Sequence, residues 1–413
     1  MNTWSEPAIF NATSTNVRGL NLINTGGIIR EDPVNASPSI VYRASNPDLV
    51  RALVVNQNDG ANGDTLELEL LSQKDIAGDY LLEIYIPSNS LQYIHTGDGG
   101  NTVVGPNTLV VDSNRDIEIK ALGSGSIFVE TENIGSSFFM VEAQSSGDIH
   151  INVDNILSAD VLDLAAQGSG EVSLLAGYTS TTSLVAVASG SGNVFVGNPT
   201  NDRASPSIMT TDLITKVFGD GSVVFLTDGS CASSFVRTSG TGSAFLSSMT
   251  CQDTGVVLLN TGNIYVTSTD SFASEDRGTG DVFAAIDALT TNATGTYYPL
   301  PDNVLLGAPT YTSLVVPDRT PTTIEIKGVH STSPDKLPPT VVSRGSNAIG
   351  EGCVAGIVLA LVLLAAIAGV LIRRRVKARK HPQVKLNYVT EVEFAQLATP
   401  AAADEKVLSM QTA

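Results

Sequence analysis

The chain of 413 residues is long enough to bury a sizeable core, and its composition argues against several classes of function. Charged residues make up 16% of the chain, and 23 Lys and Arg against 42 Asp and Glu give a net charge of −19. This acidic balance argues against a nucleic-acid partner, which requires a basic surface. Four histidines and three cysteines leave little material for a zinc site, and we expect no cofactor.

The first 94 residues contain strand patterns but no regular repeat. Apolar and other residues alternate in LELEL at 66–70 and in LEIYI at 82–86, and this period of two is typical of a half-buried strand. We interpret residues 1–94 as an N-terminal β cap for the repeats that follow. Stacked repeats need such a cap because the terminal strands would otherwise expose unpaired edges.

A glycine motif recurs from residue 78 to residue 285, at intervals that average about 22 residues. In each copy a small, polar or acidic residue and then an apolar strand follow the glycine. The ten glycines are Gly78, Gly100, Gly125, Gly147, Gly170, Gly192, Gly221, Gly242, Gly262 and Gly280. A roughly fixed period of this length is typical of a solenoid, and each repeat carries at least two short strands. The sequence therefore predicts an all-β parallel β-helix over residues 95–300, with a meander or sandwich of hairpins and a disordered segment as the alternatives.

Side chains within a repeat are expected to alternate between the core and the outside. Ile149, Ile151 and Val153 fall on one face, because successive residues of a strand point to opposite sides of the sheet. We therefore predict that Ile151 is buried. Its neighbour His150 should point outward, and the change His150→Ala should alter stability by no more than about 0.5 kcal/mol.

The start of the repeats resembles a known family. The segment LEIYIP at 82–87, the segment LQYIHTGDG at 91–99 and the glycine-plus-strand units after them are similar to the head domain of autotransporter adhesins, the GIN-domain family. The likeness spans roughly residues 60–285, rests on glycines and apolar spacing, and contains no catalytic residue. It implies a surface β-helix with an adhesive role. This chain departs from the family in its C-terminal apolar segment and polar tail.

Two cysteines and three sequons carry predictions of covalent modification. Cys231 and Cys251 are 20 residues apart, about one repeat, which would place them on adjacent coils at a separation that a disulfide accepts. We predict a disulfide, with two buried free thiols as the alternative, and a location outside the cytoplasm would permit the bond. The N-x-[ST] motifs predict glycosylation at Asn11, Asn35 and Asn292.

Catalytic and metal-binding patterns are weak in this sequence. Asp148, Glu171 and Asp281 follow repeat glycines, but Ser or Asn takes the same position in other repeats, which argues against a ladder of calcium ligands. A polysaccharide hydrolase would need paired carboxylates, and a lyase would need a base, often with a cation. The histidines do not pair at metal-ligand spacing. We therefore expect no catalytic, cofactor-binding or metal-binding residue, and no enzyme.

The C-terminal region has the pattern of a membrane anchor. The segment VAGIVLALVLLAAIAGVLI at 354–372 is uncharged and long enough to cross a bilayer as a helix. Six Lys and Arg residues lie within 373–380, whereas the nearest one on the other side is Arg344, so the positive-inside rule places the C-terminus in the cytosol. We predict a stalk rich in Pro, Ser and Thr at 301–352, a transmembrane helix at 353–372 and a cytosolic tail at 373–413. Small-residue pairs in the helix would let two copies pack as a homodimer.

These patterns combine into one functional prediction. The sequence indicates a single-pass type I glycoprotein of the plasma membrane, with its N-terminal region extracellular. Its β-helix is expected to act as an adhesin-like or ligand-binding surface for a glycan or a protein. Two alternatives stay open, namely a polysaccharide-active enzyme on the same scaffold and a receptor that signals through the short tail.

Overall fold

The computed structural model describes residues 4–60, 63–199, 207–286, 292–301, 307–313, 316–317 and 322–326, all of which belong to one compact unit, Met1–Thr332. This part of the chain forms 23 strands and one six-residue helix, α1 (Pro47–Ala52). None of its helical structure is long and apolar enough to span a membrane. The predicted transmembrane helix at 353–372 and the predicted tail at 373–413 lie outside the described residues.

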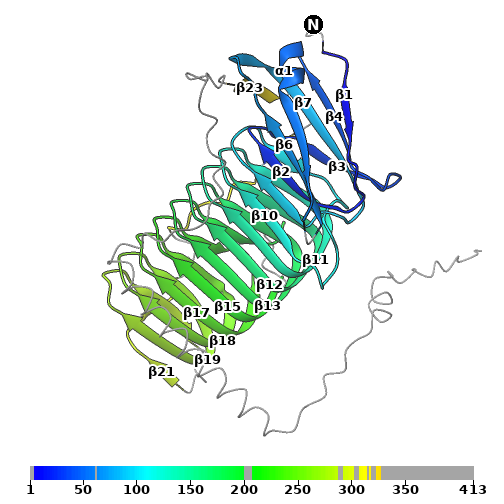
Figure 1. The fold of residues 1–413 in the computed structure, drawn as a ribbon. Helices are drawn as coiled ribbons and strands as arrows, with labels where there is room; N and C mark the ends of the chain where they lie inside the picture. The colour runs from blue at the N-terminus through cyan, green and yellow to red at the C-terminus, as the bar shows by residue number, and fades with distance from the viewer. Residues whose placement is uncertain are drawn as a thin grey trace, which may run out of the picture. The chain divides into compact units, whose positions relative to one another are not determined.

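Seven strands and α1 form a cap that continues into the repeats (Figure 1). The strands are β1 (Ala8–Asn11), β2 (Val17–Ile23), β3 (Ile28–Asp32), β4 (Ser39–Ala44), β5 (Leu53–Asn58), β6 (Asp64–Leu70) and β7 (Ile76–Pro87). β4 pairs antiparallel with β1 and β7, and β5 pairs antiparallel with β6. β2 also runs parallel to β8 (Tyr93–Thr96), and β3 runs parallel to β9 (Thr102–Val104), so the cap covers the edge of the first coil.

The strands from β8 to β22 pair in parallel and stack as coils (Figure 1). Those not yet given are β10 (Ile117–Ala121), β11 (Ile127–Ala143), β12 (Ile149–Ala166), β13 (Val172–Ala188), β14 (Val194–Gly197), β15 (Ile208–Val217), β16 (Val223–Phe225), β17 (Gly229–Thr238), β18 (Ala244–Leu258), β19 (Ile264–Asp276), β20 (Val282–Ile286), β21 (Asn292–Thr294) and β22 (Tyr298–Pro299). Ile127, Ile149 and Val172 lie opposite one another, at intervals of about 22 residues. The predicted parallel β-solenoid and its period are therefore confirmed.

Each full coil has three walls, which we define along β12. Wall A comprises residues 149–153 and the residues stacked on them, wall B comprises 156–159, and wall C comprises 161–166. The register of β12 against β13 shifts between Val153 and Ile156, where the chain passes from wall A to wall B. Inward side chains such as Ile151 and Leu164 are at most 1% exposed, within a continuous core that also includes the cap.

The repeat glycines stand where the backbones of neighbouring coils come close together. A Cβ atom on Gly192 would collide with the backbone carbonyl oxygen of Gly170 in the adjacent coil, and Gly242 has the same relation to Gly221. Any larger residue would push the two coils apart. The glycine period in the sequence therefore reflects close approach between coils.

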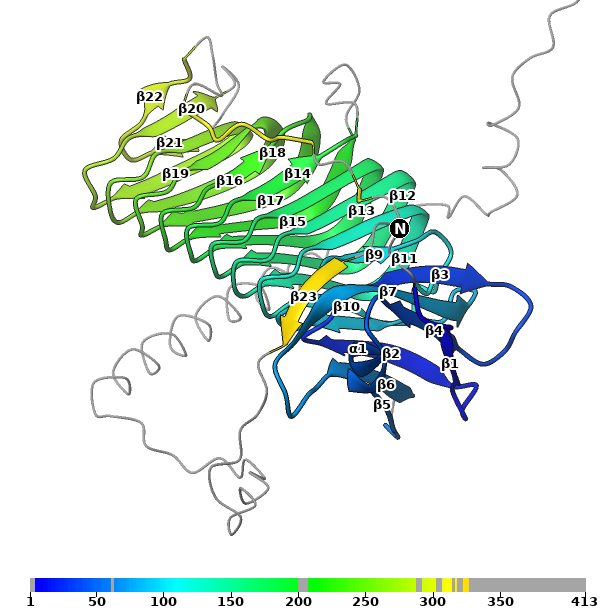
Figure 2. The ribbon, with the colours of Figure 1, turned by 90° about the horizontal axis from the view of Figure 1, so that it is seen from above.

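After the last coil the chain returns toward the cap. We call the described residues 298–301, 307–313, 316–317 and 322–326 the return segment (Figure 2). Its last part forms β23 (Thr322–Ile326), which pairs antiparallel with β7 of the cap. An extended stalk was predicted over 301–352. The residues of this range that the structure describes lie against the solenoid and the cap, and the others lie outside the described residues.

Candidate functional site: a covered pocket on wall A

Wall A is largely apolar on its outer face as well as on its core face. One outward position per coil is filled in turn by Phe128, His150, Ser173, Phe195, Val224, Phe245, Tyr265 and Phe283. Ring centroids are 4.8 Å apart between Phe245 and Tyr265, and 4.9 Å apart between Tyr265 and Phe283. These distances match the spacing of neighbouring strands, since each ring lies one coil beyond the last.

The return segment covers this outer column. It contributes Leu300, Ala308 and Tyr311 to an apolar cluster with Phe195, Val224, Phe245 and Tyr265 of wall A, separate from the main core. The ring of Tyr311 lies 5.4 Å from that of Phe195, which is 0% exposed although it points away from the core. The sequence does contain a signal that the outer face of wall A is buried. A strand with one solvated face would alternate apolar and polar residues, whereas runs such as VFV at 194–196 are apolar at every position.

A cavity of about 180 Å³ lies between wall A and the return segment, where His150 and Ser173 interrupt the apolar column. Its apolar lining includes Phe128, Leu175, Tyr311 and Val316, and its polar lining includes Glu130, His150, Asn152, Ser173 and Ser313. An apolar pocket with a few polar groups is typical of a small-molecule site, although most such sites are larger, about 300–1,000 Å³. This pocket therefore suits a small ligand or one ring of a larger one.

Two polar atoms that line the cavity are buried and lack a partner among the described residues: Nε2 of His150 and Oδ1 of Asn152. The other ring nitrogen of His150, Nδ1, lies 2.6 Å from Oγ of Ser173. A buried polar atom left without a hydrogen bond costs about 1–3 kcal/mol. A ligand that bonds to these two atoms would remove that cost.

His150 differs from its prediction in one respect. It points away from the core, as the alternation predicted, but it is only 9% exposed because the return segment lies over it. Its ring stacks on Phe128, with centroids 5.4 Å apart and an interplanar angle of 25°. The prediction that His150→Ala leaves stability almost unchanged assumed a solvated side chain. That assumption is wrong, because the side chain is packed under the return segment.

The surroundings of the pocket favour the neutral form of its histidine. Burial lowers the pKa of His150, and Asp148 opposes this effect. At the neighbouring turn, burial and repulsion from Asp148 raise the pKa of Glu171 to about 7. Burial likewise raises the pKa of Tyr311, which hydrogen-bonds to Ser173. With His150 in its neutral form, the described lining of the pocket offers no cationic side chain to pair with an anion.

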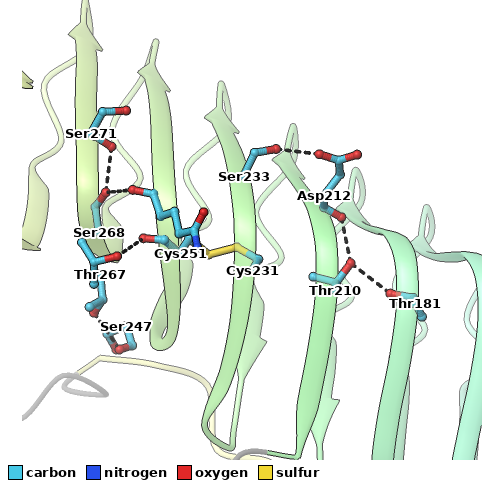
Figure 3. The surroundings of a disulfide bond; sticks show 12 residues. Thr181, Thr210, Asp212, Cys231, Ser233, Ser247, Cys251, Thr267, Ser268 and Ser271 are labelled. Atoms are coloured by element: carbon cyan, nitrogen blue, oxygen red, sulfur yellow. Dashed lines mark hydrogen bonds between the residues drawn. A yellow bond between two sulfur atoms is a disulfide. The ribbon is translucent and has the colours of Figure 1, made fainter. Parts of the chain in front are cut away.

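Cys231 and Cys251 form a disulfide on wall B (Figure 3). They face each other directly in the register of β17 and β18, with Cα atoms 4.5 Å apart. The same inward column contains Thr210 and Thr181, whose hydroxyl groups are 3.0 Å apart. Since the two cysteines are 5% and 2% exposed, the bond joins two coils from inside the solenoid.

The three predicted glycosylation sites fall on separate elements. Asn11 ends β1 and Asn35 follows β3, and both are exposed. The side chain of Asn35 donates to Asp32 at 2.8 Å. Asn292 is the first residue of β21. Exposure makes Asn11 and Asn35 accessible to modification, and glycosylation stays a prediction.

The described residues offer little for metal or acid–base catalysis. They contain no group of three or more His, Cys, Asp and Glu side chains placed to hold a metal ion. His95, on wall C, lies 2.8 Å from Glu118, which in turn lies 2.7 Å from Lys120. These three side chains lie on wall C, outside the pocket described above. The Glu118 carboxylate is already paired with Lys120, as in a structural ion pair.

The fold and the pocket thus define a capped parallel β-solenoid with a small covered cavity on one wall. No model of a known protein family matches the chain, and no curated protein matches it.

Solved structures with similarity to the chain include adhesin candidates and one candidate lipid-binding protein. An adhesin candidate from Parabacteroides merdae is 12% identical, with a TM-score of 0.44, and the match covers 68% of this chain and 96% of that one. An adhesin candidate from Parabacteroides distasonis is 10% identical, with a TM-score of 0.42 and coverage of 68% and 97%. A candidate lipid-binding protein from the same organism is 13% identical, with a TM-score of 0.36 and coverage of 71% and 97%.

Proposed function

We propose that this protein is an adhesin-like surface β-solenoid that binds a neutral sugar ring in the pocket on wall A. The observation that carries the proposal is the pair of unpartnered buried atoms, Nε2 of His150 and Oδ1 of Asn152, that line a cavity partly walled by aromatic rings. A sugar ring presents hydroxyl groups at its edge and C–H groups on its faces. It therefore matches both the polar atoms and the aromatic faces.

The charge of the pocket narrows the ligand class. Oδ1 of Asn152 is an acceptor, and Nε2 of His150 also accepts when the proton of the neutral ring is on Nδ1 and is donated to Ser173. The ligand must then supply two hydrogen-bond donors, as adjacent hydroxyl groups do. Glu130 in the lining and Asp148 at the neighbouring turn would repel sulfated or sialylated sugars. A neutral glycan fits these constraints.

The proposal for membrane anchoring and family relationship rests on the sequence. The proposal includes anchoring by the apolar segment at 354–372, an extracellular N-terminal region, a cytosolic tail and a relationship to the GIN-domain family. Its support is the charge asymmetry around the apolar segment and the pattern of glycines and apolar strands. A glycan on a neighbouring cell or on a matrix would be the natural ligand for such a protein.

A glycan array probed with the full-length protein tests the function. We expect retention on arrays of neutral glycans and weak retention on sulfated or sialylated ones, without release of cleaved product. Released product would favour the polysaccharide-active enzyme instead. The absence of binding to any neutral glycan would contradict the proposal.

A matched pair of variants ties the binding to the pocket. His150→Phe keeps a ring that can stack on Phe128, much as Phe245 and Phe283 stack on Tyr265 in later coils, but it removes both ring nitrogens. We expect this variant to lose affinity at least tenfold while its thermal unfolding stays close to that of the wild type. His95→Phe, on wall C outside the pocket, is the control and should bind normally. Equal binding by all three proteins would exclude this pocket as the site.

A further inference from the structure

The pocket on wall A gathers hydrogen-bond acceptors. The unpartnered Oδ1 of Asn152 can only accept, whereas the role of Nε2 of His150 depends on where the ring proton lies. Ser173 has one proton and hydrogen-bonds to both His150 and Tyr311. With that proton donated to Tyr311, Ser173 accepts from Nδ1–H of His150, and Nε2 is left to accept from a ligand.

Glu130 adds a third acceptor and a negative charge to the same lining. It lies directly opposite Asn152 on the neighbouring coil, and His150 lies two residues before Asn152 on the same outer face. None of the salt bridges between described residues involves Glu130. Its side chain is exposed, whereas that of His150 is 9% exposed. The acceptors therefore extend from the buried part of the cavity to its solvent-exposed rim.

The charges around the pocket favour a positively charged ligand. The described lining contains no Lys or Arg, and the described Lys and Arg residues between 121 and 276, namely Lys216 and Arg237, lie on wall C. Asp148 lies close enough to favour a positive charge on the ring of His150. It would favour a positive charge on a ligand beside that ring in the same way.

A protonated amino group suits this arrangement better than a hydroxyl group does. An ammonium group carries three N–H donors and no acceptor, so its donors equal the three acceptors in number. A hydroxyl group supplies one donor and no charge. The aromatic rings of Phe128 and Tyr311 also line the cavity, and the face of an aromatic ring attracts a cation.

We propose that the pocket prefers a sugar ring that bears a free amino group to the same ring with a hydroxyl or an N-acetylamino group in its place. The inference rests on the proposed function in taking a sugar ring as the ligand, and it goes further by naming the substituent that is recognised. The ammonium group donates to Nε2 of His150, Oδ1 of Asn152 and the carboxylate of Glu130. N-acetylation would remove the charge and leave a single N–H donor, so it should weaken binding.

Three disaccharides that differ only at carbon 2 of each ring test the preference. They are β-1,4-linked pairs of glucose, N-acetylglucosamine and glucosamine, which carry a hydroxyl, an N-acetylamino and an amino group. Calorimetric titration of the full-length protein at about pH 7, where most of an amino group is protonated, measures the three affinities. We expect a Kd at least tenfold lower for the glucosamine disaccharide, which corresponds to about 1.4 kcal/mol. Equal or weaker binding of this disaccharide, or no binding, would overturn the inference.

A matched pair of variants separates the pocket from a general attraction between an acidic protein and a cation. Glu130→Gln removes the carboxylate of the pocket, and Glu132→Gln removes an equal charge from an exposed position two residues further along β11, outside the described lining. The first variant should lose most of the preference for the amino group, and the second should keep it. Both should bind the glucose disaccharide as the wild type does, which shows that they are folded. Equal losses of the preference would overturn the assignment of the ammonium group to this pocket.

His150→Phe distinguishes a failure of this inference from a failure of the proposed function. Binding of the neutral disaccharides that this variant abolishes, without a preference for the amino group, would refute the inference alone. Binding of only the glucosamine disaccharide, also abolished by the variant, would support the inference and contradict the neutral ligand of the proposed function. Binding of the glucosamine disaccharide that the variant leaves unchanged would overturn the inference, because the site would then lie elsewhere.

Discussion

At the scale of single residues, Ile151 occupies the centre of an inward-facing triplet on wall A. It is 1% exposed and lies opposite Val129 and Leu174 on the two neighbouring coils. Ile151→Ala should lower the free energy of unfolding by about 2–5 kcal/mol through cavity formation. Ser158→Ala, at an exposed position of the same strand, should change it by no more than about 0.5 kcal/mol. Urea denaturation measures both, and equal losses would mean that the alternation does not mark the core.

Glu171 should make stability depend on pH. Its pKa in the folded protein is about 7, above the ordinary value of 4.5, because burial and Asp148 disfavour the charged form. The stability that the protonated form contributes is fully present below about pH 4.5 and is lost as pH rises through about 7. Glu171→Gln should therefore exceed the wild type in stability by about 1–2 kcal/mol at pH 8, after allowance for solvent screening, and by much less at pH 4. Denaturation at both pH values checks this, and a constant difference would contradict it.

At the scale of elements, the disulfide between β17 and β18 closes a loop of 20 residues. The loop-entropy model gives about 3 kcal/mol of stabilisation for a loop of this length. Replacement of Cys231 and Cys251 by Ala should therefore lower stability by about that amount in non-reducing conditions. Mass mapping of the unreduced wild type should find the two cysteines in one cross-linked peptide. Two alkylatable thiols in the native protein would contradict the bond.

The return segment is a second element whose contribution can be measured. Phe195 points away from the core but is 0% exposed, because Tyr311 and its neighbours lie over it. Phe195→Ala should therefore lower stability by about 3–5 kcal/mol, as for a core phenylalanine. Ser180→Ala, at an outward position of wall B, is the control. A loss below about 1 kcal/mol at Phe195 would mean that the return segment does not cover wall A in solution.

At the scale of the whole molecule, charge predicts the orientation in the membrane. Residues 1–352 carry 15 Lys and Arg against 38 Asp and Glu, whereas residues 373–413 carry 8 against 4. Tags at residues 1 and 413 should report opposite sides of the membrane, with residue 413 cytosolic, because Lys and Arg are retained on the cytosolic side. Protease treatment of intact cells should remove only the N-terminal tag. Removal of the C-terminal tag would reverse the assignment.

Sequence alone determined the features that repeat from coil to coil. The glycine period predicted the solenoid because Gly192 and Gly170 must approach closely in adjacent coils, and the alternation at 149–153 identified the core face. Both signals arise from contacts between equivalent positions of neighbouring coils. Such contacts impose the same requirement every 22 residues or so, and they therefore leave a periodic pattern in the chain.

Only the tertiary structure decided which walls are covered and where the pocket lies. The contact of Tyr311 with Phe195 and the pairing of β23 with β7 join segments that are far apart in the chain and are not equivalent positions of a repeat. Such contacts occur once in the chain, so they produce no repeating pattern in the sequence. For the same reason the sequence placed His150 in solvent, and it did not show that His150 and Asn152 line a shared cavity. The physical cause is that the side of the sheet to which a strand residue points is set by its immediate neighbours in the chain. Its burial depends in addition on whichever distant segment packs over that side.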